Sequence, residues 1–225
     1  MNILVIGSQA NAQECRDKFG PSHGYTRVDH QQEAEKFFGT SDVVFDFVIE
    51  KDRSQMEVYR DHKGVTAFLN TSLVSLLELS TEVKNQIHCT LFGFCGLPTF
   101  LNRELLEISL RREEDSTELQ RICKLLQTDF VVVVDRVGLV TPRVICMIIN
   151  EAFYTVQEGT ASKKDIDIAM KLGTNYPLGP FEWAKKIGIE NVYLVLDSVY
   201  KDTKDERYKI CPLLKKEYLN QIIQP

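Results

Sequence analysis

An almost uninterrupted apolar run, Val43 to Ile49 (VVFDFVI), constrains the fold of this chain more than any other feature. A short run of this kind is typical of a strand that is buried on both faces, as in a parallel sheet. Further strand-like runs occur at residues 3–6, 25–29, 66–71, 91–94 and 131–134. Helix-compatible segments such as 10–19 separate the runs. Strands that alternate with helices predict a parallel sheet covered by helices.

The pattern changes after Asp135. Apolar residues recur at helical spacing between Val144 and Val156, which predicts an amphipathic helix. Ser162 and Asp165 have the spacing of a helix N-terminal cap, and a Pro-Gly-rich break at 176–180 precedes another predicted helix around Phe181. We therefore expect an α/β domain over residues 1–135 and an all-α domain over residues 136–225.

Composition narrows the class of partner. The chain has 225 residues, with 27 Lys and Arg against 32 Asp and Glu and a net charge of −5, which disfavours binding to nucleic acid or to an anionic membrane. It has no apolar run of the roughly 18 residues that a membrane span needs. The N-terminus has no basic region or cleavage site of a signal peptide, so we expect a cytoplasmic protein.

The six cysteines are irregularly spaced and include no C-x-x-C pair. Without an export signal they are expected to be reduced and mostly buried. The four histidines do not add the closely spaced Cys and His pairs of a zinc site, so no metal is expected.

The segment from Glu158 to Glu182 is distinctive. It reads EGTASKKDIDIAMKLGTNYPLGPFE. This resembles the C-terminal helical domain of the 3-hydroxyacyl-CoA dehydrogenase family, whose pattern E-G-x-A-S-x-x-D-I-D-x-A-M-K-L-G-x-x-Y-P-x-G-P-F-E it follows almost letter for letter. The resemblance implies a Rossmann-like domain, here shortened, followed by the helical domain, which often forms a homodimer. It also implies NAD as cofactor and reversible oxidation of the 3-hydroxyl group of an acyl-CoA.

The nucleotide motifs of that family are partly kept. Gly7 stands at the first glycine of G-x-G-x-x-G, but Gln9 occupies the second, where a side chain obstructs the pyrophosphate. Asp29 follows the second strand, where an acid accepts the ribose hydroxyls, although it is equally well explained as a turn or surface residue. Glu50 matches the final acid of the family's D-L-V-V-E-A-I-x-E. The chain also lacks the family's long helical excursion between Asp29 and Asp42, which helps to hold CoA.

The catalytic motifs are more eroded. Ser72, in Asn70-Thr71-Ser72, matches the family's substrate-binding serine, and Glu107 matches the acid that orients the catalytic histidine. Gly93 stands at the position of that histidine, and Pro142 at that of the catalytic asparagine. His88 and Asn150 are the nearest replacements. His88 is expected to point the other way from position 93 and to have a core or surface role, and Asn150 is about two helical turns beyond Pro142.

Three functions remain open. The first is a divergent NAD-dependent 3-hydroxyacyl-CoA dehydrogenase that retains Ser72 and Glu107 as catalytic residues, with Gly7, Asp29 and Glu50 as cofactor-binding residues. The second is a non-catalytic member that binds an acyl-CoA-like or nucleotide ligand, or a protein partner. The third is a subunit whose missing groups come from a partner chain. Gln9, Gly93 and Pro142 favour weak or absent activity, whereas the resemblance favours the enzyme.

Overall fold

The computed structural model describes residues 1–83 and 87–223, and these form two compact units, Met1–Leu139 and Val140–Pro225. We call them unit 1 and unit 2 and describe each by itself. No helix in the described part of the chain is both long and apolar enough to cross a membrane.

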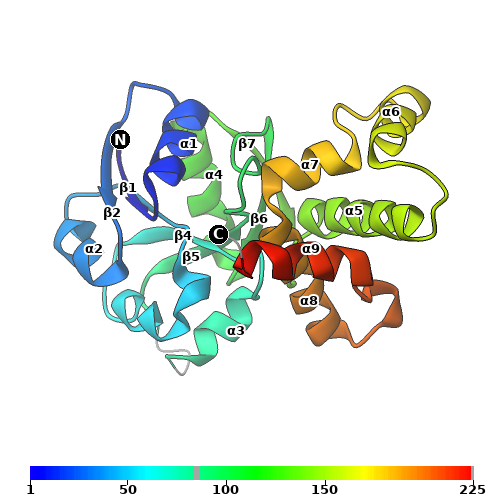
Figure 1. The fold of residues 1–225 in the computed structure, drawn as a ribbon. Coiled ribbons are helices and arrows are strands. Elements are labelled where there is room, and N and C mark those ends of the chain that lie inside the picture. Colours follow the sequence, from blue (N-terminus) through cyan, green and yellow to red (C-terminus); the bar gives the residue numbers. More distant parts are fainter. Residues whose placement is uncertain (84–86, 224–225) are drawn as a thin grey trace. The chain divides into compact units, whose positions relative to one another are not determined.

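Unit 1 is built on one seven-stranded sheet in the order β2-β1-β3-β4-β5-β6-β7 (Figure 1). Its strands are β1 (Asn2–Ile6), β2 (Gly24–Val28), β3 (Val43–Asp46), β4 (Thr66–Asn70), β5 (Thr90–Phe94), β6 (Leu105–Leu110) and β7 (Asp129–Val133). Its α-helices are α1 (Gln9–Phe19), α2 (Gln31–Phe38), α3 (Leu76–Thr81) and α4 (Ser116–Leu125), and its 3-10 turns are η1 (Ile49–Lys51), η2 (Arg53–Tyr59) and η3 (Glu113–Asp115).

The alternation of side chains along β1 builds the core of unit 1 on both faces of the sheet. Leu4 and Ile6 belong to one buried cluster, which includes residues of α2, η2 and α3. Ile3 and Val5 belong to the other, which includes residues of α1 and α4. The sheet is thus covered on both faces, as the apolar run at residues 43–49 predicts.

Three details of the sheet differ from the prediction. The first five strands in its order are parallel, but β5 pairs antiparallel with β6, so the sheet is only mostly parallel. Strand β6, which no predicted run includes, has the sequence LLEISL with a partly alternating burial pattern, and it pairs in parallel with β7. Strand β3 also ends earlier than predicted. The side chain of Asp46 accepts hydrogen bonds from the backbone amides of Val48 and Ile49, which folds the chain back into a turn.

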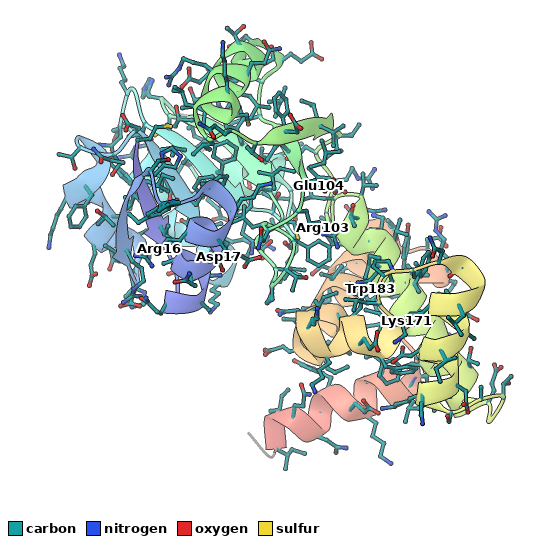
Figure 2. All side chains as sticks on the ribbon, turned by 90° about the horizontal axis from the view of Figure 1, so that it is seen from above. Arg16, Asp17, Arg103, Glu104, Lys171 and Trp183 are labelled. Atoms are coloured by element: carbon teal, nitrogen blue, oxygen red, sulfur yellow. The ribbon has the colours of Figure 1, made fainter. Side chains whose placement is uncertain are left out.

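Unit 2 is helical. Its elements are α5 (Thr141–Gln157), α6 (Lys163–Thr174), α7 (Pro180–Ile187), α8 (Ile189–Thr203), η4 (Glu206–Tyr208) and α9 (Pro212–Ile223). Ser162 caps α6 by accepting a hydrogen bond from the amide of Asp165, as its spacing predicts. Lys171 of α6 forms an ion pair of 2.6 Å with Glu182 of α7, near Trp183 (Figure 2). The Pro-Gly-rich segment thus separates two helices that are joined again by side chains.

Candidate functional site

The carboxyl ends of the parallel strands in unit 1 carry most of the residues that the family motifs point to. Gly7 follows β1, Asp29 follows β2, and Glu50 follows β3. Ser72 lies just beyond β4. In open α/β sheets ligands bind at this edge, where loops from neighbouring strands diverge.

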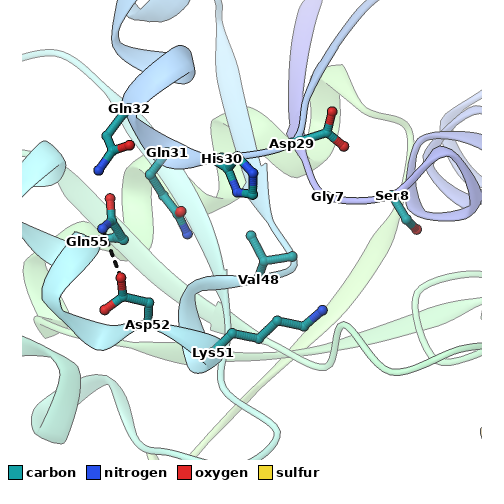
Figure 3. Close-up of a pocket in the computed structure, with 10 residues that line it drawn as sticks. All are labelled: Gly7, Ser8, Asp29, His30, Gln31, Gln32, Val48, Lys51, Asp52 and Gln55. Atoms are coloured by element: carbon teal, nitrogen blue, oxygen red, sulfur yellow. Dashed lines mark hydrogen bonds between the residues drawn. The ribbon is translucent and has the colours of Figure 1, made fainter.

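A pocket of about 680 Å³ opens beside the ends of β1, β2 and β3 (Figure 3). It is lined by Gly7, Ser8, Asp29, His30, Gln31, Gln32, Val48, Lys51, Asp52 and Gln55. Two of the predicted cofactor-binding residues, Gly7 and Asp29, are therefore brought together in one pocket. Its size falls within the range of about 300–1,000 Å³ that is usual for small-molecule sites.

The turn between β1 and α1 is closed by its own side chains. Gly7 has a φ of +155°, and a Cβ there would lie 2.8 Å from Asn11 Oδ1. Both the backbone conformation and the lack of space for a side chain therefore favour glycine at this position. Asn11 Oδ1 accepts hydrogen bonds from the amide and the hydroxyl of Ser8, while Ser8 Oγ accepts from the Asn11 amide. Gln9, the first residue of α1, is exposed. This capping box uses two amides at the helix start, where a pyrophosphate would otherwise bind.

Asp29 is exposed and paired with Arg27. The Arg27 guanidinium lies 2.5 Å from Asp29 Oδ1 and also donates to the carbonyl oxygen of Gly7. The hydrogen bond from Arg27 lowers the pKa of Asp29, so the carboxylate is ionised at neutral pH. Arg27 thereby joins the end of β2 to the turn after β1, on the rim of the pocket.

Asp46, at the end of β3, is the most buried acid of this edge. It has no exposed surface, and its carboxylate accepts hydrogen bonds from Gln31 Nε2, the Tyr59 hydroxyl and the amides of Val48 and Ile49. Burial raises its pKa to about 6, while these hydrogen bonds favour the ionised form. At neutral pH the carboxylate therefore holds together α2, η2 and the start of η1.

The ends of β3 and β4 are joined by a second polar network, around Asn70. Its Nδ2 donates to Glu50 Oε2 at 2.9 Å, and its Oδ1 accepts from the Ser72 hydroxyl at 2.6 Å and from the Gly96 amide at 2.8 Å. Glu50 Oε1 accepts from the Leu73 amide at 2.5 Å. Burial raises the pKa of Glu50 to about 8, so this half-buried carboxyl holds a proton at neutral pH.

Two predicted residues, Glu50 and Ser72, are thus connected through Asn70, although they come from different strands. Ser72 is fully buried, and its hydroxyl lies 3.4 Å from Cys95 Sγ. Burial raises the pKa of the Cys95 thiol to about 12, with smaller contributions from Glu50 and Glu107. Glu107 itself lies on β6 and is half-buried. Glu50, Asn70, Ser72 and Cys95 therefore form a closed, hydrogen-bonded cluster rather than an activated nucleophile.

Gly93, which the motif comparison predicts at the position of the family histidine, lies within β5 and pairs with Leu69 of β4 and Ser109 of β6. A Cβ at this position would lie 2.3 Å from Ser109 Oγ and 2.6 Å from Thr71 Oγ1. Real Cβ atoms do not approach heavy atoms this closely, so the neighbouring side chains have filled the space of a side chain at position 93.

The remaining motif residues have structural roles. Pro142 lies in the first turn of α5 and is buried, where its missing N–H is tolerated. Asn150 is also buried. Its side chain donates to the Lys209 carbonyl oxygen and accepts from the Cys211 amide, which fastens the segment before α9 to α5. His88 is exposed and precedes β5, at the opposite end of that strand from Gly93. A surface position of His88 agrees with the expected core or surface role.

Three residues of this edge were not singled out as site residues from the sequence: Gln31, Asp46 and Asn70. Asp46 carried a usable signal, because a lone acid in an apolar run must find hydrogen-bond donors when it is buried. Gln31 carries no such signal, since its partner Asp46 is distant in the sequence. Asn70 is marked by its place in Asn70-Thr71-Ser72, but that motif does not predict its hydrogen bond to Glu50.

Comparisons with known proteins agree with this architecture. Residues 138–221 match the family model of the 3-hydroxyacyl-CoA dehydrogenase C-terminal domain. A 3-hydroxyadipyl-CoA dehydrogenase of Escherichia coli (strain K12) is 40% identical over 87 residues, which is 39% of this chain and 18% of that protein. A probable 3-hydroxybutyryl-CoA dehydrogenase of Bacillus subtilis (strain 168) is 27% identical over 182 residues, 78% of this chain and 63% of the relative.

The chain aligns with less than two thirds of the length of each of these two relatives. The fold is also that of a crystallised (S)-3-hydroxybutyryl-CoA dehydrogenase from Ralstonia eutropha, with a TM-score of 0.76 and 18% identity over 98% of this chain and 94% of that one. Residues 138–221 thus match the C-terminal domain of the 3-hydroxyacyl-CoA dehydrogenase family, and the chain as a whole is similar in sequence and in fold to dehydrogenases of that name.

Proposed function

We propose that this protein is a member of the 3-hydroxyacyl-CoA dehydrogenase family. We further propose that it binds the adenosine part of a nucleotide in unit 1 and catalyses hydride transfer weakly or not at all. The packing at Gly93 carries the proposal, because Ser109 and Thr71 fill the space that a side chain would need at this position, which the motif comparison predicts for the histidine. A positioned histidine contributes about 10²–10⁴-fold in rate, so its loss removes most of the expected activity.

The fit of NAD supports the same proposal. The adenosine half has a pocket with Asp29 and Val48 in its lining. The pyrophosphate does not fit equally well, since the capping box of Ser8 and Asn11 already uses amides of the turn and Gln9 adds a side chain there. We therefore expect NAD to bind less tightly to this protein than it would to a protein with an intact glycine-rich turn.

Titration of NADH, followed by its fluorescence, together with turnover of acetoacetyl-CoA tests the proposal. We expect weak binding of NADH and a turnover at least about 10²-fold below that of an active relative assayed in parallel, such as the Ralstonia eutropha enzyme. Saturable binding in the micromolar range with turnover equal to that of the relative would overturn the proposal in favour of an active dehydrogenase.

An acyl-CoA-type ligand and a homodimer through the helical unit remain part of the proposal. Exposed apolar side chains on α6 (Ile168 and Leu172) and α9 (Leu219, Ile222 and Ile223) support the dimer. Sedimentation at micromolar concentration tests it, and a monomer at that concentration would contradict it. We propose no nucleic-acid partner, because the net charge is −5.

A further inference from the structure

Gln31 has an unusual position for an amide side chain. It is the first residue of α2 and only 4% exposed, yet it lines the pocket beside Val48 and His30 (Figure 3). Its Nε2 lies 3.0 Å from one oxygen of Asp46 and 3.3 Å from the other. The side chain therefore connects the pocket to the buried carboxylate.

The chemistry of Asp46 fixes which way this amide is turned. An ionised carboxylate only accepts hydrogen bonds, so the NH₂ group of Gln31 must face Asp46, and the carbonyl oxygen Oε1 must face away from it. The reverse orientation would bring two acceptors together inside the protein, where an unpaired polar atom costs roughly 1–3 kcal/mol. Tyr59 and the amides of Val48 and Ile49 hold the carboxylate in place from the other sides.

We propose that Gln31 is a specificity-determining residue that accepts a hydrogen bond from the amino group of an adenine base, and that Asp46 is the positioning residue that sets its orientation. This inference rests on the proposed binding of adenosine in the same pocket. The other polar side chains of the lining are Ser8, Asp29, His30, Gln32, Lys51, Asp52 and Gln55. Gln55 Nε2 donates a hydrogen bond to Asp52 Oδ2 at 2.9 Å, so the amide group of Gln55 already has a partner at the start of η2.

The two oxygens of Asp46 have different partners, so a single substitution at Asp46 can reverse the orientation of the Gln31 amide. Oδ1 accepts the amides of Val48 and Ile49, whereas Oδ2 accepts Tyr59 and the shorter bond from Gln31. In Asp46→Asn the carboxamide oxygen takes the place of Oδ1 and its NH₂ group that of Oδ2. That NH₂ group donates to Gln31, whose amide then turns over and presents its own NH₂ group to the pocket.

The experiment measures adenosine and purine riboside, which lacks the 6-amino group, by calorimetric titration. Neither probe has a phosphate, so the capped turn does not affect the result. The unmodified protein is expected to bind adenosine about tenfold more tightly, the effect of one hydrogen bond of about 1.4 kcal/mol. Gln31→Leu is expected to bind the two equally. Asp46→Asn is expected to prefer purine riboside, because two donors then face each other.

Tyr59→Phe is the matched control. It removes a different hydrogen bond from the same oxygen of Asp46 but keeps the carboxyl group. Because loss of that bond raises the pKa of Asp46, the titrations are done at pH 8, where the carboxylate is ionised and the preference for adenosine is expected to remain. Thermal unfolding of each variant establishes that it is folded at the titration temperature.

The outcomes separate the two proposals. Equal binding of adenosine and purine riboside to the unmodified protein would overturn the role of Gln31 while leaving nucleoside binding intact. A preference that survives in Gln31→Leu would do the same. If neither nucleoside binds at millimolar concentration, the proposed function fails, and the inference fails with it. Loss of preference in Tyr59→Phe, with the fold intact, would overturn the role of Asp46 alone.

Discussion

The two halves of the sheet edge in unit 1 differ in whether side chains fill the space between their loops. Beside β1, β2 and β3 the loops leave a pocket of about 680 Å³ with Gly7, Asp29 and Gln31 in its lining. Beside β4 and β5 the corresponding space is occupied by Asn70, Ser72 and Cys95, which bind one another. We call these the open half and the filled half. Under the proposed function, nucleoside binding belongs to the open half, whereas the predicted catalytic residue Ser72 belongs to the filled half.

The largest expected effect is a side chain at Gly93 in the filled half. Gly93→Ala places a Cβ 2.3 Å from Ser109 Oγ and 2.6 Å from Thr71 Oγ1, so we expect a loss of about 3 kcal/mol of unfolding free energy. Denaturant unfolding measures it. Gly39→Ala is the control, since a Cβ there meets no atom within 4 Å and is expected to leave the stability unchanged or slightly higher. Equal stability of the two variants would show that position 93 is not filled.

The next effect concerns Asn70, which ties together the filled half. Asn70→Ala leaves Ser72, Gly96 and Glu50 without their shared partner, and we expect a loss of roughly 2–3 kcal/mol in the free energy of unfolding. Gln120→Ala, an exposed substitution on α4, serves as the comparison and should change it by less than about 0.5 kcal/mol. Adenosine binding in the open half should survive Asn70→Ala. Loss of both together would show that the halves are coupled.

Glu50 gives the filled half a dependence on pH. Its pKa is about 8 in the folded protein against an ordinary 4.5, so the folded state binds the proton more tightly than the unfolded chain. The unfolding free energy should therefore be highest below pH 4.5 as far as Glu50 is concerned, and fall as the pH rises toward 8. Asp46 contributes in the same direction, but only between its ordinary 3.8 and about 6.

Stability curves of Glu50→Gln between pH 6 and 8 isolate the contribution of Glu50. We expect a smaller decrease in this window than in the unmodified protein, because the variant has no proton to lose at this position. Glu33→Gln, on the exposed face of α2, should keep the full decrease. A decrease of the same size in Glu50→Gln and in the unmodified protein would assign the effect to other groups.

The smallest expected effect on stability lies in the open half. Asn11→Ala combined with Gln9→Gly removes the capping box and the side chain at the second glycine position, at a cost of about 1–2 kcal/mol in unfolding free energy. The Ser8 amide, which donates to Asn11 Oδ1 in the capping box, then becomes available for a pyrophosphate. NADH affinity should rise by about tenfold, while adenosine affinity should change by less than about twofold. An unchanged NADH affinity would mean that the turn does not limit dinucleotide binding.

Much of the architecture follows from local patterns in the sequence. The run at residues 43–49 predicts a buried strand of a covered sheet, and Ser162 with Asp165 marks the start of α6, because strand burial and helix capping depend on neighbours within a few residues. The segment from Glu158 to Glu182 likewise shows, from adjacent residues alone, the resemblance to the C-terminal domain that the family model matches. Strand β6 was missed because L-L-E-I-S-L alternates only in part and follows a long loop.

The sequence by itself determined the fold class and the resemblance to the 3-hydroxyacyl-CoA dehydrogenase family, and it predicts departures from the family motifs at Gln9, Gly93 and Pro142. Only the tertiary structure decided what replaced them. The filling of position 93 depends on Ser109 and Thr71, and the orientation of Gln31 depends on Asp46, in each case through contacts between separate elements. Such contacts are set by strand order and packing, which no local pattern specifies.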